Sequence, residues 1–413
     1  MSCRMSLRNK RIAILNDSTK YGRLTIMQQP IVHTYSLGEL YTERKEKGDP
    51  SLPILTVSIH AGVSEGELDE DKLGKKVKRI ADKTQYKTAR KGDLVFNMMR
   101  AWQGAIGVVR SDGLVSPAYI VAKPNEKIWP EYMDYCMKTP RMIHAIHRQS
   151  YGVTDFRLRL YWDSFTPITC QLPTLPEQQK IAAILSTQDK VIELKEKLLA
   201  QKQQQKKYLM QQLLTGKKRL PGFDRKWNYV KANEIFKSIV DKSHDGKLEV
   251  LSSTQDKGIV PRSQVDIDIK YNENSLSTYK KVCEGDFVIS LRSFQGGIEY
   301  SNYAGIVSPA YTVLRAIVKI DNGYYKQFFK SSNYIKRLNV AVYGIRDGKQ
   351  ISYDDFGQIK IPVPPIEEQR EVAKVLSTAD HEIDLLQKSI EAEKQKKKAL
   401  MQLLLTGKVR VKI

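Results

Sequence analysis

Cysteine is scarce in this chain of 413 residues, and its four cysteines are scattered. No two of them have the CxxC spacing of a zinc or redox site, and none has a histidine beside it. This pattern excludes a disulfide framework and a zinc site of the usual kind, so we expect reduced and structurally incidental thiols. The four residues are Cys3, Cys136, Cys170 and Cys283.

Long apolar runs are also missing. No segment approaches the roughly eighteen apolar residues that a membrane-spanning helix requires. The first residues, "MSCRMSLRNKRIAILNDS", lack the apolar core and the small-residue cleavage site of a secretory signal. We therefore expect the chain to stay in the cytoplasm.

Recognisable catalytic motifs are absent too. "TGKK" and "TGKV" lack the upstream glycine and the hydroxyl of an ATP-binding GxxxxGK[ST] loop, and "VPPI" lacks the first residue of the [N/D]PP[F/Y/W] segment of amino-methyltransferases. Asp354 and Asp355 are expected in a turn or helix cap rather than in a metal-dependent nuclease. His144 and His147 have no carboxylate or cysteine pattern beside them, so surface or packing histidines are expected rather than metal ligands.

These absences predict a non-catalytic chain with no metal and no cofactor of its own. Two alternatives stay open at this point. One is a DNA-binding methyltransferase or nuclease with an unrecognised site, and the other is a coiled-coil scaffold protein.

Positive charge is what the sequence has in excess. It contains 68 lysines and arginines against 46 acidic residues, which gives a formal net charge of +22. Such a charge favours a polyanionic partner, because each neutralised phosphate releases condensed counterions. A soluble basic protein that binds nucleic acid only unspecifically is the alternative.

The second half of the chain repeats the first. "LPTLPEQQKIAAILST" begins at Leu172 and "VPPIEEQREVAKVLST" begins at Val363, 191 residues later; "LLTGK" at Leu213 returns at Leu404 with the same offset. Upstream, "RAWQGAIG", "SPAY", "YGVTD" and "WDSF" return as "RSFQGGIE", "SPAY", "YGIRD" and "YDDF". The offset drifts by only one or two residues, which indicates duplication of a whole domain and its trailing segment.

Each repeat begins with a globular part. "GDLVFNMM", "AIGVV" and "GLVSPAYIVAK" predict short strands separated by glycine and proline, and "GDFVISL", "GIEYSN" and "GIVSPAYTVLRA" repeat them. A helical stretch follows in both copies; in the first, Pro130 suits a first turn and Pro140 breaks the helix. The fold class predicted for each repeat is therefore α+β.

Each repeat ends in a long helix with a narrow apolar seam. The first is predicted over Glu177 to Leu214, which is 38 residues or roughly 57 Å, with Glu177 and Glu368 in the first turns and Gly216 and Gly407 as C-terminal caps. Apolar residues recur at heptad spacing in the same register in both copies. The seam positions are Ile181, Leu185, Ile192, Leu199, Leu209, Leu213, Val372, Leu376, Ile383, Leu386, Ile390, Leu400 and Leu404.

Two matching seams in one chain predict an intramolecular antiparallel coiled coil that holds the two globular domains at opposite ends of a rod. The alternative is that each helix packs on its own domain. The basic stretches "KQQQKK" and "KQKKK" are interpreted either as a solvated face or as a docking surface for acidic partners.

The order of domain, "LPTLPEQQKIAAIL" and "LLTGK", then domain, "VPPIEEQREVAKVL" and "LLTGK", closely resembles the DNA-specificity subunit of type I restriction-modification systems. The resemblance runs from about Tyr35 to the end of the chain. It implies two target-recognition domains that each bind half of a split double-stranded DNA site, and helices that set the spacing and dock two modification subunits. Those subunits methylate adenine with S-adenosylmethionine; restriction subunits that use ATP are possible further partners.

The domains expected on this basis are 1–172 and 217–363 for target recognition, and 173–216 and 364–413 for the spacer helices and the C-terminal tail. Residues 1–34 have no counterpart in the second copy, and their role is open.

Candidate DNA-binding residues follow from comparing the copies. Because the two half-sites normally differ, residues shared by the copies are predicted to serve the fold or contact phosphates, and polar residues that differ are predicted to bind base edges. The shared set is Arg100, Gln103, Tyr119, Tyr151, Arg292, Gln295, Tyr311 and Tyr343. The differing set is Thr154, Arg157, Arg159, Arg346, Lys349 and Gln350, with Ser58, His60, Thr254, Gln255 and Lys257 as less secure members.

Overall fold

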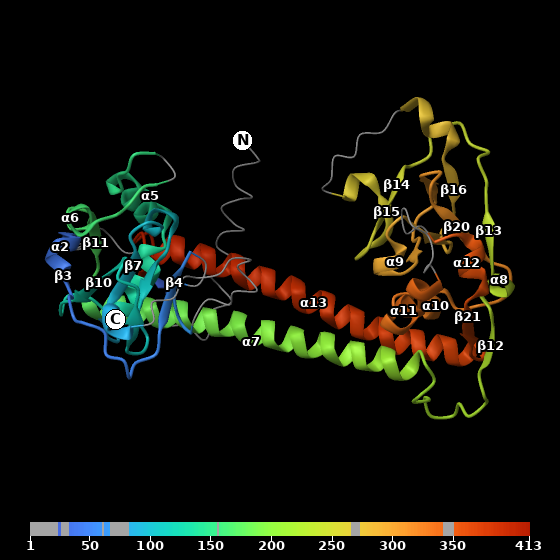
Figure 1. Cartoon of the computed structure of the whole chain (residues 1–413), viewed down its shortest axis with the longest axis horizontal. Helices are drawn as coiled ribbons and strands as arrows, with labels where there is room; N and C mark the ends of the chain where they lie inside the picture. The colour runs from blue at the N-terminus through green and yellow to red at the C-terminus, as the bar shows by residue number, and fades with distance from the viewer. Residues whose placement is uncertain are drawn as a thin grey trace. The chain divides into compact units, whose positions relative to one another are not determined.

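The computed structural model describes residues 24–25, 33–59, 62–66, 82–154, 157–265, 273–341 and 351–413. These form two compact units, which we call unit 1 (residues up to Leu194, together with Ile390–Ile413) and unit 2 (Lys195–Ser389). The two long helices, α7 (Leu175–Leu213) and α13 (Ile366–Leu404), each contribute one part to unit 1 and the other part to unit 2 (Figure 1).

Unit 1 is built around a four-stranded antiparallel sheet of order β3-β10-β7-β8. Its strands are β3 (Tyr41–Glu43), β7 (Leu94–Asn97), β8 (Ile106–Val108) and β10 (Tyr119–Pro124). Four strand pairs accompany it: β2 (His33–Ser36) with β11 (Thr169–Leu172), β4 (Leu55–Ser58) with β5 (Gly62–Glu65), β6 (Lys87–Ala89) with β9 (Gly113–Val115), and β1 (Leu24–Thr25) with β22 (Arg410–Val411).

Unit 2 repeats this arrangement with a central sheet of order β13-β20-β17-β18. Its strands are β13 (Phe236–Ile239), β17 (Phe287–Ile289), β18 (Glu299–Tyr300) and β20 (Thr312–Ala316). The pairs are β12 (Asn228–Lys231) with β21 (Lys360–Val363), β14 (Leu251–Thr254) with β15 (Gly258–Pro261), and β16 (Lys280–Val282) with β19 (Gly305–Val307). The predicted duplication of an α+β domain is confirmed, although the β1–β22 pair has no counterpart among the described residues of unit 2.

Alternation along the strands gives each central sheet two buried faces. In unit 1, Leu94 and Phe96 of β7 contribute to one hydrophobic cluster, whereas Val95 between them contributes to another. In unit 2, Phe287 of β17 contributes to one hydrophobic cluster and Val288 contributes to another. Successive side chains of a strand point to opposite faces, so these nearly continuous apolar runs indicate a sheet that is covered on both sides.

Short helices cover one face of each sheet. The first predicted helical stretch is confirmed as α4 (Pro130–Met137) and α5 (Pro140–Gln149), each beginning with proline at its first turn, and the second forms α10 (Asn322–Phe329) and α11 (Ser332–Ala341). The remaining helices of unit 1 are α2 (Leu37–Leu40), α6 (Trp162–Phe165), η1 (Lys83–Gln85) and η2 (Ala101–Gln103). Those of unit 2 are α8 (Ala232–Ile235), α9 (Ser293–Gly296), α12 (Tyr353–Gln358), η3 (Arg262–Gln264) and η4 (Glu273–Thr278).

The long helices agree closely with their predicted limits and seam. Both have 39 residues, and both are followed by a glycine with positive φ, +69° at Gly216 and +67° at Gly407, as expected of C-terminal caps. Every predicted seam residue is buried or half-buried. The seam ends enter the globular cores, because Ile181 and Leu404 belong to a cluster of unit 1 and Leu213 and Val372 to one of unit 2. Helix-to-helix and helix-to-domain packing therefore coexist.

Within each unit the helices run antiparallel and are joined by polar contacts along the seam. In unit 1, Gln188 donates to a carboxylate oxygen of Glu393 at 2.7 Å. In unit 2, Lys202 binds Glu382 at 2.7 Å and Lys206 binds Asp380 at 2.5 Å. Those two lysines come from the "KQQQKK" stretch, so neither the solvated face nor the acidic docking surface suggested for that stretch describes them.

The duplicated Glu-Gln pair at the helix start has a role that the sequence did not reveal. Glu368, with 0% of its surface exposed, binds Arg219 through two contacts of 2.6 Å and accepts a hydrogen bond from Trp227 Nε1 at 2.8 Å. Glu177 binds Arg410 in the same two-pronged manner. Each arginine follows the end of one long helix and binds the start of the other, so we call these two ion pairs the terminal clasps.

The glutamines beside the clasps fix each long helix to its own globular domain. Gln178 accepts from the backbone N–H of Trp129, just before α4, and donates to the carbonyl of Pro173. Gln369 does the same with Asp321, just before α10, and with Pro364. Buried amides that satisfy backbone groups on two segments hold those segments in one geometry.

The structure describes three of the four cysteines and the expected cap at Asp355. Among the described cysteines, Cys136 and Cys170 are buried and Cys283 is exposed, and all three are free thiols; burial raises the pKa of Cys136 to about 11. Asp355 forms a capping box with Ser352 at α12, as expected of a cap. Across the described ranges no cluster of His, Cys, Asp or Glu has metal-binding geometry, and no helix combines the length and apolarity needed to traverse a bilayer.

Candidate nucleic-acid interface

The turn after the central strand carries the same exposed polar residues in both units. In unit 1, Arg100 is the N-cap of η2 after β7 and Gln103 is its last residue; in unit 2, Arg292 and Gln295 lie at α9 after β17. All four side chains are exposed, and none makes a hydrogen bond or ion pair to another described residue. We call these segments, residues 98–103 and 290–295, the exposed turns.

Each exposed turn lies beside a shared tyrosine at the start of the neighbouring strand. Burial raises the pKa of Tyr119 and of Tyr311, and the positive charges of Arg100 and Arg292 oppose that shift. Lys87 Nζ donates to the Tyr119 carbonyl at 2.7 Å, and Lys280 Nζ donates to the Tyr311 carbonyl at 2.6 Å. The structure thus brings together shared residues that are distant in sequence.

In unit 1 the segment after α5 folds against the exposed turn. Tyr151 pairs with Arg159 as an antiparallel bridge, and the N–H of Leu160 donates to the Met98 carbonyl at 2.9 Å. The Arg157 and Arg159 side chains are exposed, whereas the Thr154 hydroxyl oxygen is buried. Two of the three differing residues predicted here therefore present their polar groups to solvent, next to the shared set.

In unit 2 the counterpart of that segment is not described: Tyr343, Arg346, Lys349 and Gln350 lie outside the described residues, as does His60 of unit 1. The turn between β14 and β15 is described. There the Thr254 hydroxyl donates to the Gly258 carbonyl and accepts from the Lys257 N–H, so it serves the turn itself. Gln255 and Lys257 are exposed, and Ser58, at the equivalent end of β4, is half-buried.

The β14–β15 turn touches the exposed turn of unit 2. A Cβ atom at Gly296 would lie 2.9 Å from Cγ of Gln255, and Lys330 Nζ donates to the carbonyls of both Gln255 and Gly296. Lys330 also binds Glu299, which is 2% exposed. In unit 1, the equivalent Lys138 binds Asp134 instead, and Asp134 Oδ1 lies 3.2 Å from where a Cβ at Gly107 would be.

Glu299 gives unit 2 a specific pH dependence. Burial raises the pKa of its carboxyl group above the ordinary value, against the influence of Lys330. A raised folded-state pKa contributes stability that is fully present below the unfolded pKa and is lost as the pH rises through the folded pKa. We expect Glu299→Gln to lose less stability than the unaltered chain between acidic and neutral pH. Urea titrations followed by Trp227 fluorescence measure this in chains whose Trp102, Trp129 and Trp162 are replaced with phenylalanine. Glu284→Gln, at an exposed position, is the control; parallel stability curves for Glu299→Gln and the unaltered chain would contradict the assignment.

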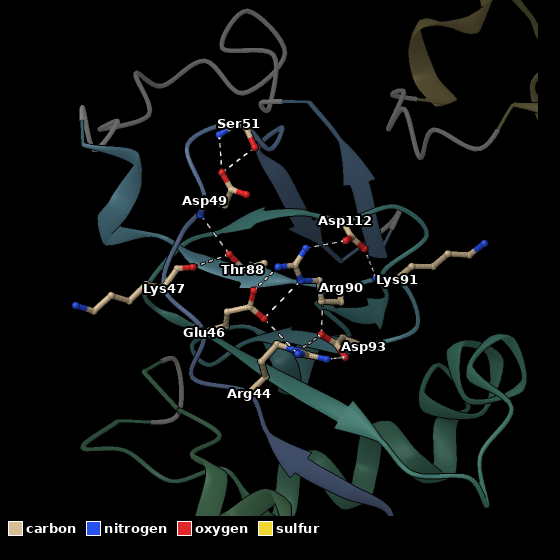
Figure 2. A network of polar contacts seen from close by, with 10 residues as sticks. All are labelled: Arg44, Glu46, Lys47, Asp49, Ser51, Thr88, Arg90, Lys91, Asp93 and Asp112. Carbon is tan, nitrogen blue, oxygen red and sulfur yellow. Dashed lines mark hydrogen bonds and ion pairs between the residues drawn. The ribbon is translucent and has the colours of Figure 1, made fainter.

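An ionic network fixes the opposite end of β7 (Figure 2). Asp93, 2% exposed, accepts from Arg44 at 2.6 and 3.1 Å and from the Arg90 N–H, while the Arg90 guanidinium binds Glu46 and Asp112. In these contacts, the hydrogen bond from Arg90 lowers the pKa of Glu46. The arginines of this network bind carboxylates of their own unit. They differ in this from the arginines of the exposed turns, whose side chains bind no described residue.

Unit 2 makes the corresponding contact with an arginine from another strand. Asp286, at the start of β17, binds Arg315 of β20 through two contacts of 2.7 Å and accepts from the Cys283 N–H at 2.8 Å. In unit 1 the arginine follows β3. The shared "GD" dipeptide before β7 and β17 was the only sequence signal for this buried carboxylate.

Comparisons with known proteins identify the family. The family model described as "Type I restriction modification DNA specificity domain" matches twice, over residues 37–203 and 224–394. Each match covers one globular domain and most of the long helix that follows it. Specificity subunits are the non-catalytic members of type I systems, in agreement with the absence of catalytic motifs noted in the sequence.

Two relatives come from Methanocaldococcus jannaschii. The chain is 26% identical over 410 residues to the putative type I restriction enzyme MjaX specificity subunit, covering 90% of each chain. It is 27% identical over 329 residues to the type I restriction enzyme MjaVIII specificity subunit, covering 73% of this chain and 75% of that one.

Solved structures share the fold. The HsdS subunit from Thermoanaerobacter tengcongensis matches with a TM-score of 0.50 and 21% identity, over 92% of this chain and 97% of that one. The type I restriction-modification S subunit from M. genitalium matches with a TM-score of 0.54 and 13% identity, over 92% and 98%. With two family matches that together span most of its length, the chain belongs to the DNA-specificity subunits of type I restriction-modification systems.

Proposed function

We propose that each unit binds one half of a bipartite site in double-stranded DNA through the surface around its exposed turn. One observation carries this proposal: the same unpartnered arginine and glutamine occur at the same turn in both units, although the fold uses neither side chain. In unit 1 the copy-specific Arg157 and Arg159 adjoin that turn. A constant cationic anchor beside variable residues suits two domains that bind the same backbone and different bases.

The residues divide into two roles on this proposal. Arg100, Gln103, Tyr119 and Tyr151, with Arg292, Gln295, Tyr311 and Tyr343, contact sugar and phosphate. Arg157 and Arg159 contact base edges, since a guanidinium can bind guanine O6 and N7 together. Gln255 and Lys257, with Ser58 and His60, supply further contacts from the neighbouring turns, as do Arg346, Lys349 and Gln350 in the second domain.

The chain then divides into target-recognition domains at 1–172 and 217–363 and spacer segments at 173–216 and 364–413. α7 and α13 set the separation of the two half-sites, because each begins in one unit and ends in the other. Mismatches typically cost about 1–3 kcal/mol per base pair, so two short half-sites at a fixed spacing discriminate far better than one.

The helices also dock two modification subunits, and an exposed leucine recurs on them in support of this. Leu194 on α7 is 55% exposed and Leu385 on α13 is 52% exposed, at equivalent positions of the repeat. One apolar contact in each unit matches one modification subunit per unit. S-adenosylmethionine is bound by those subunits, and ATP by restriction subunits where they join the complex, so this chain itself holds no cofactor.

Exchange of one domain is the direct test. Replacing residues 217–360 with the equivalent part of a relative is expected to change one half-site and leave the other half-site and the spacing unchanged, because each domain contacts its own half. Sequencing that maps methylated adenines in cells carrying the unaltered or the exchanged chain gives both half-sites and their separation.

The reciprocal exchange of the first domain, with residues 217–360 kept, is the matched control and is expected to change the other half-site. A change in both half-sites after a single exchange would rule out independent binding by the two domains. Methyl transfer by the purified chain alone would favour the rival enzyme hypothesis instead.

A further inference from the structure

An exposed apolar side chain precedes the arginine in both exposed turns. Met99 is 46% exposed and Leu291 is 50% exposed, and neither belongs to any hydrophobic cluster of the described residues. The positions are equivalent in the repeat, one residue before Arg100 and Arg292 respectively. Both units therefore keep a large apolar group at the same solvent-facing point.

The backbone around each of these residues is held in place by local hydrogen bonds. The Met99 N–H donates to Asn97 Oδ1 at 3.0 Å, and its carbonyl accepts from Trp102 Nε1 at 3.0 Å. In unit 2, Ser293 Oγ accepts from the Ser290 N–H at 2.9 Å, and Ser290 Oγ accepts from the Arg292 N–H at 3.3 Å. Different residues thus hold the backbone of the equivalent turn in the two units, whereas the side chain at position 99 or 291 is apolar in both.

Single exposed apolar residues are ordinary, but this one recurs beside an unpartnered cation in two domains that have diverged elsewhere. Base reading does not explain the recurrence, because an apolar character common to both domains does not distinguish two different half-sites. Packing does not explain it either, since both side chains lie outside the cores. What the two positions share is a need for apolar contact with something common to both half-sites.

We infer that Met99 and Leu291 act as wedges that insert between stacked base pairs from the minor groove, one in each half-site, while Arg100 and Arg292 bind the flanking phosphate. The inference rests on the proposed function and adds a mechanical part to it. Met and Leu are among the side chains that partly unstack a base step and kink the duplex. Each domain therefore deforms the DNA that it binds, and deformable steps near the half-sites favour binding.

The test uses the full-length chain and a duplex that carries the mapped bipartite site, with 2-aminopurine placed at successive positions through each half-site. The unaltered chain is expected to enhance fluorescence at one step in each half. Met99→Ala is expected to abolish the enhancement in the first half only, and Leu291→Ala in the second half only. Each substitution is expected to weaken specific binding by roughly tenfold, because a large apolar contact is lost.

Salt dependence separates the wedge from its neighbouring cation. Met99→Ala is expected to leave the slope of binding against salt unchanged, whereas Arg100→Ala is expected to reduce it by about one. Met99→Leu is expected to retain both affinity and fluorescence. Ile317→Ala is the matched control in unit 2, because Ile317 is 56% exposed and follows the end of β20 remote from Tyr311.

The outcomes distinguish the inference from the function on which it rests. If the unaltered chain fails to discriminate the mapped site from a scrambled duplex, the proposed function is wrong. If it discriminates the site, and both alanine variants bind like the Ile317→Ala control with the fluorescence pattern intact, the wedge is wrong and the proposed function stands.

Discussion

Replacing Arg219 with alanine is expected to lower the free energy of unfolding of unit 2 by about 3–5 kcal/mol, because it leaves the carboxylate of Glu368 buried without its cation. Glu368 is 0% exposed, and Arg219 supplies two of its three hydrogen bonds. The Trp227 indole N–H remains but carries no charge. Trp227 is the one tryptophan in residues 195–389, so fluorescence in urea titrations reports unfolding of this unit once Trp102, Trp129 and Trp162 are replaced with phenylalanine in every chain compared.

Two further variants make the result specific. Arg225→Ala removes an exposed arginine from the same segment and is expected to have little effect. The double change Arg219→Met with Glu368→Gln removes both charges and is expected to recover most of the loss, since it leaves no uncompensated buried ion. If Arg219→Ala unfolds at the same urea concentration as Arg225→Ala, the terminal clasp does not stabilise the unit.

Placing glutamate at both Leu194 and Leu385 is expected to abolish stable assembly with modification subunits. Loss of an apolar contact at the centre of an interface typically costs about 2–4 kcal/mol, and a buried charge adds to that cost. At tenfold per 1.4 kcal/mol, each site weakens by at least roughly 30-fold. Native mass spectrometry of the co-expressed subunits is expected to show two modification subunits on the unaltered chain, one on either single variant and none on the double variant.

Ala200→Glu with Gln387→Glu is the matched control, because both positions are exposed and lie well around the helix from Leu194 and Leu385 at 3.6 residues per turn. Circular dichroism checks that the helices are intact. Retention of two modification subunits by the Leu194→Glu, Leu385→Glu chain would show that docking uses another surface.

The sequence was most informative where a pattern extends over many residues. The heptad seams predicted α7 and α13 to within a few residues, because a period of three and four positions leaves a signal in every turn. Comparison of the copies likewise identified three of the four strands of each central sheet, but not β3 or β13. It also placed Arg100 and Tyr119 in the shared set, and the structure brings these two residues near one another although 19 positions separate them.

The sequence did not predict the ion pairs in which one partner comes from different elements in the two units. Asp93 binds Arg44, which follows β3, whereas its counterpart Asp286 binds Arg315 of β20. Lys138 binds Asp134 of α4, whereas the equivalent Lys330 binds Glu299 of β18. When the copies are compared position by position, these partner residues appear only as differences. Each ion pair is kept at the same place in the fold, but one of its two residues comes from a different position in the repeat. Only the three-dimensional structure therefore reveals the correspondence.

The terminal clasps imply an order of events during synthesis. Unit 2 is one continuous stretch, Lys195–Ser389, and it contains both partners of its own clasp. Unit 1 also needs residues 390–413, which are translated after the whole of unit 2, and among these is Arg410, the cation that neutralises the buried Glu177. When Ser389 has been translated, unit 2 therefore has every residue that it needs to fold, whereas unit 1 still lacks the cation for its buried carboxylate.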